Sequence, residues 1–357
     1  MHTFYSDGEG WHDDIANGAI EAGLDFVIVT DHNIWVDGVE GYYENENGRV
    51  LLLVGEEVHN VRRRPQASHF LAYGANRELA SFAADPQRLI DETNAAGGYG
   101  FLAHPHERDL PIINETNLGW HDWDIEGFAG LESWNYMSNL KDSMVDIWAG
   151  MRIKNKHLAM LRTIPLADKP ENHITAPPAK TLALWDKWLA EGKRVSAIGG
   201  SDAHAAKIKV WPIFERILYP YAFLFRAVNT HLRLPRAFTG DVEHDKMMVL
   251  DAIGNGRSWI GYDAPHPTAG FRFTGQGQSK GLMGDEIRFD GSATLQVRTP
   301  AKANIRIVRH GEVVASVENN TNLTHIAREK GAYRVECTLK HAGKERGWIY
   351  SNPIYLL

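Results

Sequence analysis

Four short apolar segments of the chain are each followed at once by histidines and carboxylates. These groups are Asp31–His32, Glu56–Glu57, His104–Pro105–His106 and Asp202–Ala203–His204. Imidazole and carboxylate groups bind Zn, Mn or Fe, and the residue types alone do not choose among these metals. A single such group is more often a helix cap beside a hydrogen-bonded histidine. Four of them at four strand ends predict a polynuclear metal centre.

To bring these groups together, the strands before them must end on one face of the protein. Up to residue 262, runs typical of strands alternate with segments of helical period. The predicted strands are 25–29, 50–54, 69–73, 99–103, 130–133, 194–198 and 216–219, and the predicted helices are 11–22, 86–96, 138–161, 180–191 and 245–255. Parallel β/α barrels build their sites at the carboxyl ends of the strands. We therefore expect a closed or nearly closed barrel.

The composition changes at residue 263, where a short segment with two prolines, 263–267, begins the last part of the chain. Beyond it, alternating and β-branched runs are separated by Gly and Asn turns, and helical period is absent. This pattern predicts a small all-β sandwich. The expected organisation is a barrel over residues 1–262 followed by an all-β accessory domain over residues 263–357.

Composition limits the possible functions. The 357 residues carry 38 Lys and Arg against 45 Asp and Glu, a net charge of −7, without a dense basic stripe. This argues against general nucleic-acid binding, and we expect a small-molecule substrate. Cys337 is the one cysteine, so neither an intramolecular disulfide nor a thiolate cluster is possible. The apolar runs are too short for a membrane span, and the oligomeric state is not readable.

With His2 and His69, the motifs resemble those of the PHP (polymerase and histidinol phosphatase) superfamily. The matching motifs, in order, are Ser6-Asp7-Gly8, Thr30-Asp31-His32, Gly55-Glu56-Glu57, Ala103-His104-Pro105 and Gly200-Ser201-Asp202-Ala203-His204. The resemblance covers about residues 1–262. It implies a distorted seven-stranded β/α barrel, of PHP type, that holds two or three divalent metal ions. The all-β tail looks like that of the carbaryl-hydrolase-like branch of this superfamily.

The same resemblance implies three sets of metal ligands. They are His2, Glu57 and Asp202 for one ion; Glu57, His69 and His104 for a second; and Asp7, His32 and His204 for a third. Glu57 is preferred to Glu56 because it completes the Gly-x-Glu motif and because neighbours on a strand point to opposite faces. The first histidine of the superfamily's His-x-His would precede Met1. We therefore expect a natural start further upstream, which leaves cytoplasmic and exported locations both open.

Metal-dependent hydrolysis is the chemistry that such a centre supports, because close divalent ions activate water and stabilise developing negative charge. Asp202 could accept a proton from the attacking water, and His204 or His106 could protonate the leaving group. His106 could equally be an ordinary pocket residue.

Further residues are candidates for substrate binding. Arg62, Arg63 and Arg64 could clamp a phosphate or form a solvated loop. Asn135 is expected to line the pocket. Trp134 belongs to an aromatic stretch that could form an apolar wall or part of the core.

Three functions remain open at this point. The leading one, argued mainly from the resemblance, is a phosphoesterase acting on a small phosphate ester. The alternative is a carboxylic ester, carbamate or amide hydrolase using the same ions. The third is a non-catalytic metal-binding module. A serine hydrolase is not expected, because Ser201, the serine that follows a predicted strand, is followed by Asp202-Ala203 and so does not complete Gly-x-Ser-x-Gly.

Overall fold

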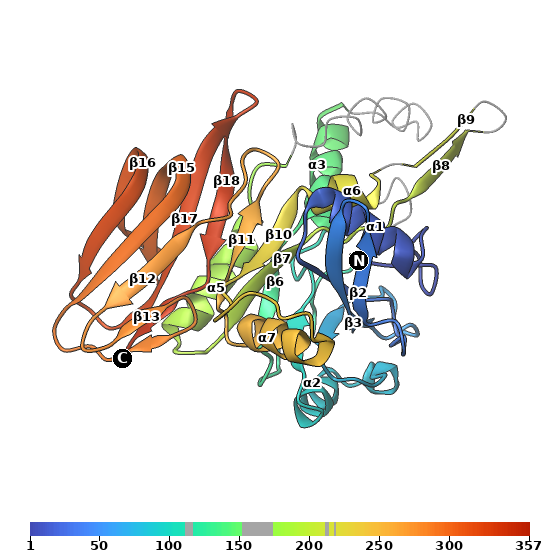
Figure 1. Cartoon of the computed structure of the whole chain (residues 1–357), viewed down its shortest axis with the longest axis horizontal. Helices are drawn as coiled ribbons and strands as arrows, with labels where there is room; N and C mark the ends of the chain where they lie inside the picture. Colours follow the sequence, from blue (N-terminus) through green and yellow to red (C-terminus); the bar gives the residue numbers. More distant parts are fainter. Residues whose placement is uncertain (111–116, 152–173, 211–213, 218) are drawn as a thin grey trace.

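The structure is a computed structural model that describes residues 1–357 except 111–116, 152–173, 211–213 and 218. Its first part is a curled seven-stranded sheet with helices around it (Figure 1). The strands are β1 (Phe26–Val29), β2 (Gly41–Asn45), β3 (Gly48–Val58), β4 (Phe70–Tyr73), β5 (Tyr99–Leu102), β6 (Gly130–Asn135) and β7 (Ser196–Gly200). Six of them follow the order β1-β3-β4-β5-β6-β7, and β2 pairs with β3.

The closed barrel that we predicted from the sequence is not confirmed. The sheet path ends at β1 on one side and at β7 on the other. Three neighbouring pairs are parallel, β1 with β3, β5 with β6 and β6 with β7. By contrast, β4 runs antiparallel to both β3 and β5. The strand predicted over 216–219 instead overlaps β9 (Phe214–Ile217), which forms a separate hairpin with β8 (Lys207–Val210).

The helices form where the sequence provides suitable ends. They are α1 (His12–Ala22), α2 (Pro86–Ala95), α3 (Tyr136–Met151), α5 (Ala179–Ala190), α6 (Tyr221–Phe225) and α7 (Val242–Gly254), with a 3₁₀ turn at Ala80–Phe82. The Asp85 side chain accepts the Arg88 N–H and Pro86 occupies the first turn of α2, which together satisfy and preorganise that helix start. The helix predicted over 138–161 is present as α3, and its last predicted residues lie outside the described part.

The second sheet has ten strands, and the small all-β sandwich that we predicted for the tail is not confirmed. Its strands are β10 (Val228–Leu232), β11 (Ser258–Tyr262), β12 (Arg272–Gln276), β13 (Lys280–Leu282), β14 (Glu286–Ile287), β15 (Ala293–Arg309), β16 (Glu312–Ala327), β17 (Gly331–His341), β18 (Lys344–Ser351) and β19 (Ile354–Leu356). The long β15 pairs with β12 near its start and with β17 near its end, while β16 follows its other edge. Two runs predicted as separate strands, 294–298 and 305–309, both belong to β15.

The two sheets contribute to a common apolar cluster, and the second sheet also has a cluster of its own. Strands β10 and β11 precede residue 263, yet they belong to the second sheet because β11 pairs with β18. The Trp134 ring on β6 contacts Tyr262 on β11 and Tyr350 on β18. The domain division at residue 263 stays a prediction, and the hydrogen-bonded sheet runs across it.

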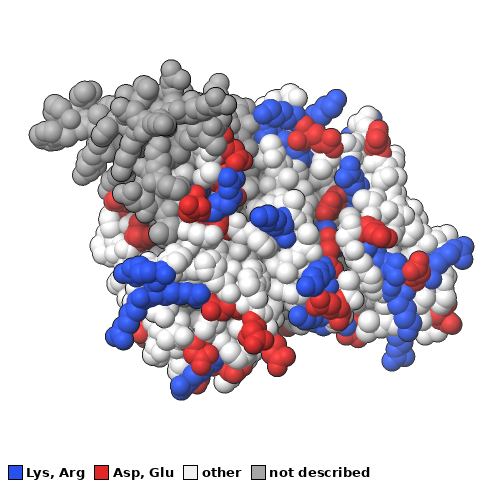
Figure 2. Space-filling view, turned by 180° about the vertical axis from the view of Figure 1, so that it is seen from behind, with Lys and Arg blue, Asp and Glu red and all other residues white. Residues whose placement is uncertain are grey.

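The surface carries mixed charge on the face seen in Figure 2, where Lys and Arg are interspersed with Asp and Glu. In the described part of the chain, no helix combines the length and the apolar character that crossing a membrane requires.

Candidate metal centre

Glu57, near the end of β3, lies at the middle of a cluster of histidines. Its Oε1 is 2.6 Å from His69 Nδ1 and 3.3 Å from His104 Nε2. Its Oε2 is 3.4 Å from His2 Nε2, which in turn lies 3.0 Å from Asp202 Oδ1. One carboxylate therefore joins two groups of possible ligands, Glu57 with His69 and His104, and Glu57 with His2 and Asp202.

A further group lies next to these two and includes the loop residue Asp7. His204 Nε2 is 3.3 Å from Asp7 Oδ1, and His32 Nε2 is 3.7 Å from Asp7 Oδ2. The His2 ring lies between them, stacked on both His32 and His204 at centroid distances of 4.4 and 4.3 Å. His2, Asp7, His32 and His204 each offer a ligand atom within 4.8 Å of the others. The structure thus brings together all eight residues predicted as metal ligands.

Strand ends position these side chains. Glu57 is a β3 residue that pairs with Leu71 of β4, and an isolated parallel bridge joins it to His32 just beyond β1. His104 follows β5 and has a positive φ of 26°, and its N–H donates to Glu132 Oε2 at 2.9 Å. Asp202 follows β7, also with a positive φ, of 51°. These backbone turns hold the side chains at one end of the curled sheet.

The hydrogen bonds around the cluster suit a cation. His69 donates from Nε2 to the Gln66 carbonyl at 2.9 Å, and His204 donates from Nδ1 to the Asp202 carbonyl at 2.8 Å. These bonds place each ring's lone pair on the nitrogen that faces a carboxylate. A lone pair and a carboxylate oxygen repel each other unless a proton or a metal ion lies between them. Ligand histidines at metal sites are held by outer hydrogen bonds of this kind, so the donor set fits divalent ions.

The centre has a buried floor and an open side. His2, Glu57, His69 and His104 are all buried, whereas the Asp7 side chain is 56% exposed. The cluster is therefore open to solvent on the side of Asp7, where the neighbouring His32 and His204 side chains are also partly exposed.

The cluster also changes the acidity of its members. Burial would raise the pKa of Glu57, but the surrounding imidazoles of His32, His104, His2 and His69 hold it well below its usual value. Burial would lower the pKa of His104, but Glu107 and Glu57 raise it to about 10. The pKa of His104 is thus raised because the ring faces carboxylates, and the pKa of Glu57 is lowered because the carboxylate faces imidazoles.

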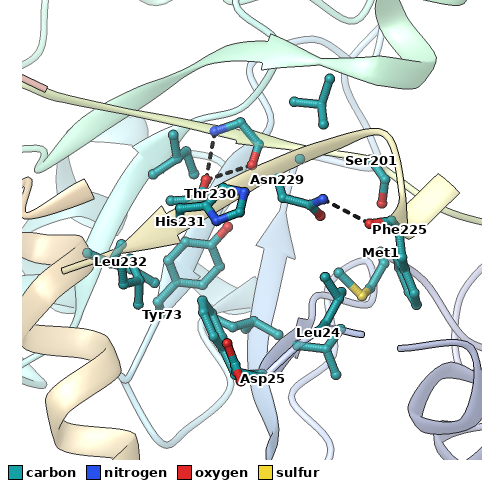
Figure 3. A pocket seen from close by; sticks show the side chains of 18 of the residues that line it. Met1, Leu24, Asp25, Tyr73, Ser201, Phe225, Asn229, Thr230, His231 and Leu232 are labelled. Carbon is teal, nitrogen blue, oxygen red and sulfur yellow. Dashed lines mark hydrogen bonds between the residues drawn. The ribbon is translucent and has the colours of Figure 1, made fainter. Parts of the chain in front are cut away.

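An internal cavity of about 660 Å³ meets the centre at Glu57, Glu132 and Asp202. It is lined on one side by Met1 and residues 24–28, at the free edge of β1, and on the other by residues of β7 and β10 (Figure 3). Inside it, the Thr230 hydroxyl bonds both the N–H and the carbonyl of Gly199, which ties β10 to β7. The cavity thus lies where the sheet path is open.

Several residues predicted to act on substrate lie elsewhere. The His106 ring contacts Thr181, at 2.9 Å from Nδ1 to Oγ1, and stacks near Trp123 in a hollow outside the main cavity; it also lines a smaller hollow that reaches His104. Arg63 pairs with Asp122, which also accepts a hydrogen bond from Ser68.

The other arginines and the aromatic residue are likewise placed away from the cluster. Arg64 donates to backbone carbonyls of its own loop, and Arg62 is exposed. Trp134 is fully buried in the core, and its Nε1 donates to Asn139. Asn135 does line the cavity, where its amide donates to Glu132 Oε2 at 3.0 Å.

Some site residues were missed or left undecided by sequence reasoning. Glu132, on β6, borders the cavity, and none of the sequence motifs above includes it. His59 lies beside His32 and His69 and was not singled out, although its position two residues after Glu57 puts it on the same face of the strand. Glu107 is buried beside His104, and Lys141 donates to it at 2.6 Å. No sequence motif marks Glu107, because its partner Lys141 belongs to α3 and meets it only in the folded protein.

The comparisons with known proteins assign the chain to no family. No protein-family model matches the chain, and no curated protein matches it. A solved structure that is similar is the crystal structure of a two-domain protein containing a predicted PHP-like metal-dependent phosphoesterase from Bacteroides vulgatus. The TM-score is 0.39 at 14% sequence identity, and the alignment covers 99% of this chain and 93% of that chain.

Proposed function

We propose that the protein is a metal-dependent hydrolase of small phosphate esters and that the Glu57 cluster is its active site. The observation that supports this most strongly is the position of Glu57. Three histidines approach its two oxygens within 3.4 Å, and Asp202 and the Asp7 group adjoin it. The preference for phosphate esters comes from the sequence motifs, and the geometry fits hydrolysis of either ester class.

We propose that two or three ions of Zn, Mn or Fe bind here, held by the three ligand sets centred on Glu57 and Asp7. When bound, such ions supply Lewis acidity and make water a stronger nucleophile at neutral pH. The remaining steps belong to side chains of this chain.

Asp202 is the proposed proton acceptor. Its carboxylate lies at the cavity wall, 3.0 Å from His2 Nε2. Burial would raise its pKa, but His2 and His204 keep the pKa low, so the carboxylate is ionised at neutral pH.

His204 is the proposed donor to the leaving group when the centre holds two ions, because its Nε2 would then carry a proton in place of the third ion. Its Nδ1 is fixed by the Asp202 carbonyl, and its partly exposed ring lies on the open side beside Asp7. The proposal makes no use of His106, whose ring occupies a different hollow.

The test uses metal-loaded protein with a panel of phosphomonoesters, phosphodiesters and aryl carboxylic esters, each with and without chelator. We expect phosphate-ester cleavage that the chelator abolishes and added metal restores. Chelator-sensitive cleavage of carboxylic esters alone would instead support the ester, carbamate or amide hydrolase. Stoichiometric metal without either activity would support a non-catalytic module, and no bound metal would contradict all three.

A further inference from the structure

His59 lies in the candidate centre but belongs to none of the three ligand sets. Its ring stacks on His69 at a centroid distance of 4.3 Å and meets the His32 ring edge-on at 4.9 Å. One ring nitrogen from each of the three histidines lies within 4.8 Å of the others. His59 is therefore close to a ligand from each of two different sets.

Asn33 fixes the orientation and the tautomer of His59. The His59 backbone N–H donates to Asn33 Oδ1 at 2.9 Å, which determines which end of the amide is the oxygen. The amide nitrogen of Asn33 must then be the donor to His59 Nδ1, at 3.4 Å. Nδ1 accepts this bond through its lone pair, so the proton of the neutral ring is on Nε2.

This arrangement is the reverse of the one at the ligand histidines. At His69 and His204, the outer nitrogen donates to a carbonyl and the inner nitrogen keeps a lone pair for a cation. At His59, the Asn33 amide donates to Nδ1, so the ring N–H is on Nε2. Nε2 has no hydrogen-bond partner among the residues that the structure describes.

We infer that His59 does not bind a metal ion but donates a hydrogen bond from Nε2–H to an anionic oxygen of the substrate. This inference rests on the proposed function, because it names the group that binds the ester beside the ions. An oxygen of a phosphoryl group is a suitable acceptor, since a hydrogen bond to a charged oxygen is stronger than one to a neutral oxygen. The arginines of the 62–64 loop, which sequence analysis suggested for this role, are not required for it.

Two substitutions separate a donor from a ligand. In His59→Gln, the side-chain amide nitrogen can reach the position of Nε2 and keep a donor there. In His59→Asn, the shorter amide reaches only the position of Nδ1. His325→Asn, in β16 of the second sheet, is the control for a histidine replaced far from the centre.

The experiment measures two quantities for each protein, the number of bound Mn²⁺ ions after gel filtration and the dissociation constant for inorganic phosphate. We expect every variant to keep the metal stoichiometry of the unsubstituted protein. His59→Asn should weaken phosphate binding about tenfold, as loss of one hydrogen bond to a charged group predicts, and His59→Gln should stay within about threefold.

Other results would overturn the inference. Loss of a bound ion in both His59 variants would make His59 a ligand, and unchanged phosphate affinity in His59→Asn would make it a packing residue. Metal-loaded unsubstituted protein that does not bind phosphate would also overturn it. Failure of the proposed function is seen separately and earlier, as absence of bound metal in the unsubstituted protein, and the inference would fall with it.

Discussion

At the scale of single residues, Glu56 and Glu57 show how one position along a strand separates two roles. Both carboxylates are buried on β3. Glu57 faces the histidines, whereas Glu56 faces the other side of the sheet and accepts the Leu79 N–H at 2.7 Å. Adjacent side chains of a strand point to opposite faces, so two chemically equal residues meet different surroundings.

This pair provides a matched test of the metal centre. Glu57→Gln removes the charge that two ligand sets share, and we expect bound metal to fall by at least one ion per chain. Glu56→Gln changes the same residue type on the same strand and should leave the metal content unchanged. Elemental analysis after dialysis measures both. Equal metal content in the two variants would contradict the assignment of Glu57.

Glu132 provides a second test at the residue scale, through the pH dependence of stability. Burial raises its pKa to about 7. In the unfolded chain the carboxyl loses its proton near pH 4.5, so between pH 4.5 and 7 the folded state binds more protons. The contribution of Glu132 to stability is therefore present below pH 4.5 and is lost as pH rises through 7.

Glu132→Gln cannot lose a proton and should lack this dependence, while its amide oxygen can still accept the His104 N–H. We expect the free energy of unfolding of the variant, relative to the unsubstituted protein, to rise by on the order of 2 kcal/mol between pH 5 and 8. Urea unfolding of metal-free protein at each pH measures it. Parallel pH profiles of the two proteins would refute the assignment.

At the scale of elements, the centre depends on strand ends that come from both parallel and antiparallel neighbours. Strand β4 is antiparallel to β3, so His69, which precedes β4, lies beside Glu57 near the end of β3. His32 follows β1, which is parallel to β3, and His104 follows β5, which is parallel to β6. A ligand before a strand and ligands after strands thus reach the same end of the sheet.

At the scale of the whole molecule, the two sheets are held together by core packing and by a buried ion pair. Arg334 of β17 is 2% exposed, and its Nε and Nη2 donate to the two oxygens of Asp186 on α5, both at 2.7 Å. Its guanidinium also lies 5.0 Å from the centre of the Trp185 ring. Bidentate geometry of this kind fixes the orientation of the helix against the second sheet.

Removing Arg334 should be costly because it leaves Asp186 as a buried, unpaired charge. We expect Arg334→Ala to lower the free energy of unfolding by about 3–5 kcal/mol. The control is Lys187→Ala on the same helix, where an exposed pair with Glu191 should contribute less than about 1 kcal/mol. Urea unfolding gives both values, and similar losses in the two variants would show that the buried pair does not hold the sheets together.

Much of the architecture could be predicted from sequence because local patterns encode it. Six predicted strands and the helices occur at or within a few residues of their predicted places. Six of the eight candidate ligands come together because they lie at or next to the end of a strand, whereas His2 and Asp7 come from the N-terminal segment before α1. The pairing of the strands could not be predicted, since an apolar run fits a parallel or an antiparallel neighbour equally well. The open path between β1 and β7 and the single second sheet were therefore not foreseen.

The sequence by itself determined which residue types stand at the strand ends and, through the alternation of a strand, that Glu56 and Glu57 face opposite sides. The choice of Glu57 as the ligand came from the Gly-x-Glu motif of the resemblance. Tertiary structure alone decided what surrounds each side chain. It placed the Arg63 side chain against Asp122 and Trp134 in the core, and it set the tautomer of His59 through Asn33. The physical reason is the separation along the chain of the residues that set each property. Periodicity is a property of neighbouring residues, whereas burial, charge and hydrogen-bond direction depend on residues that only folding brings into contact.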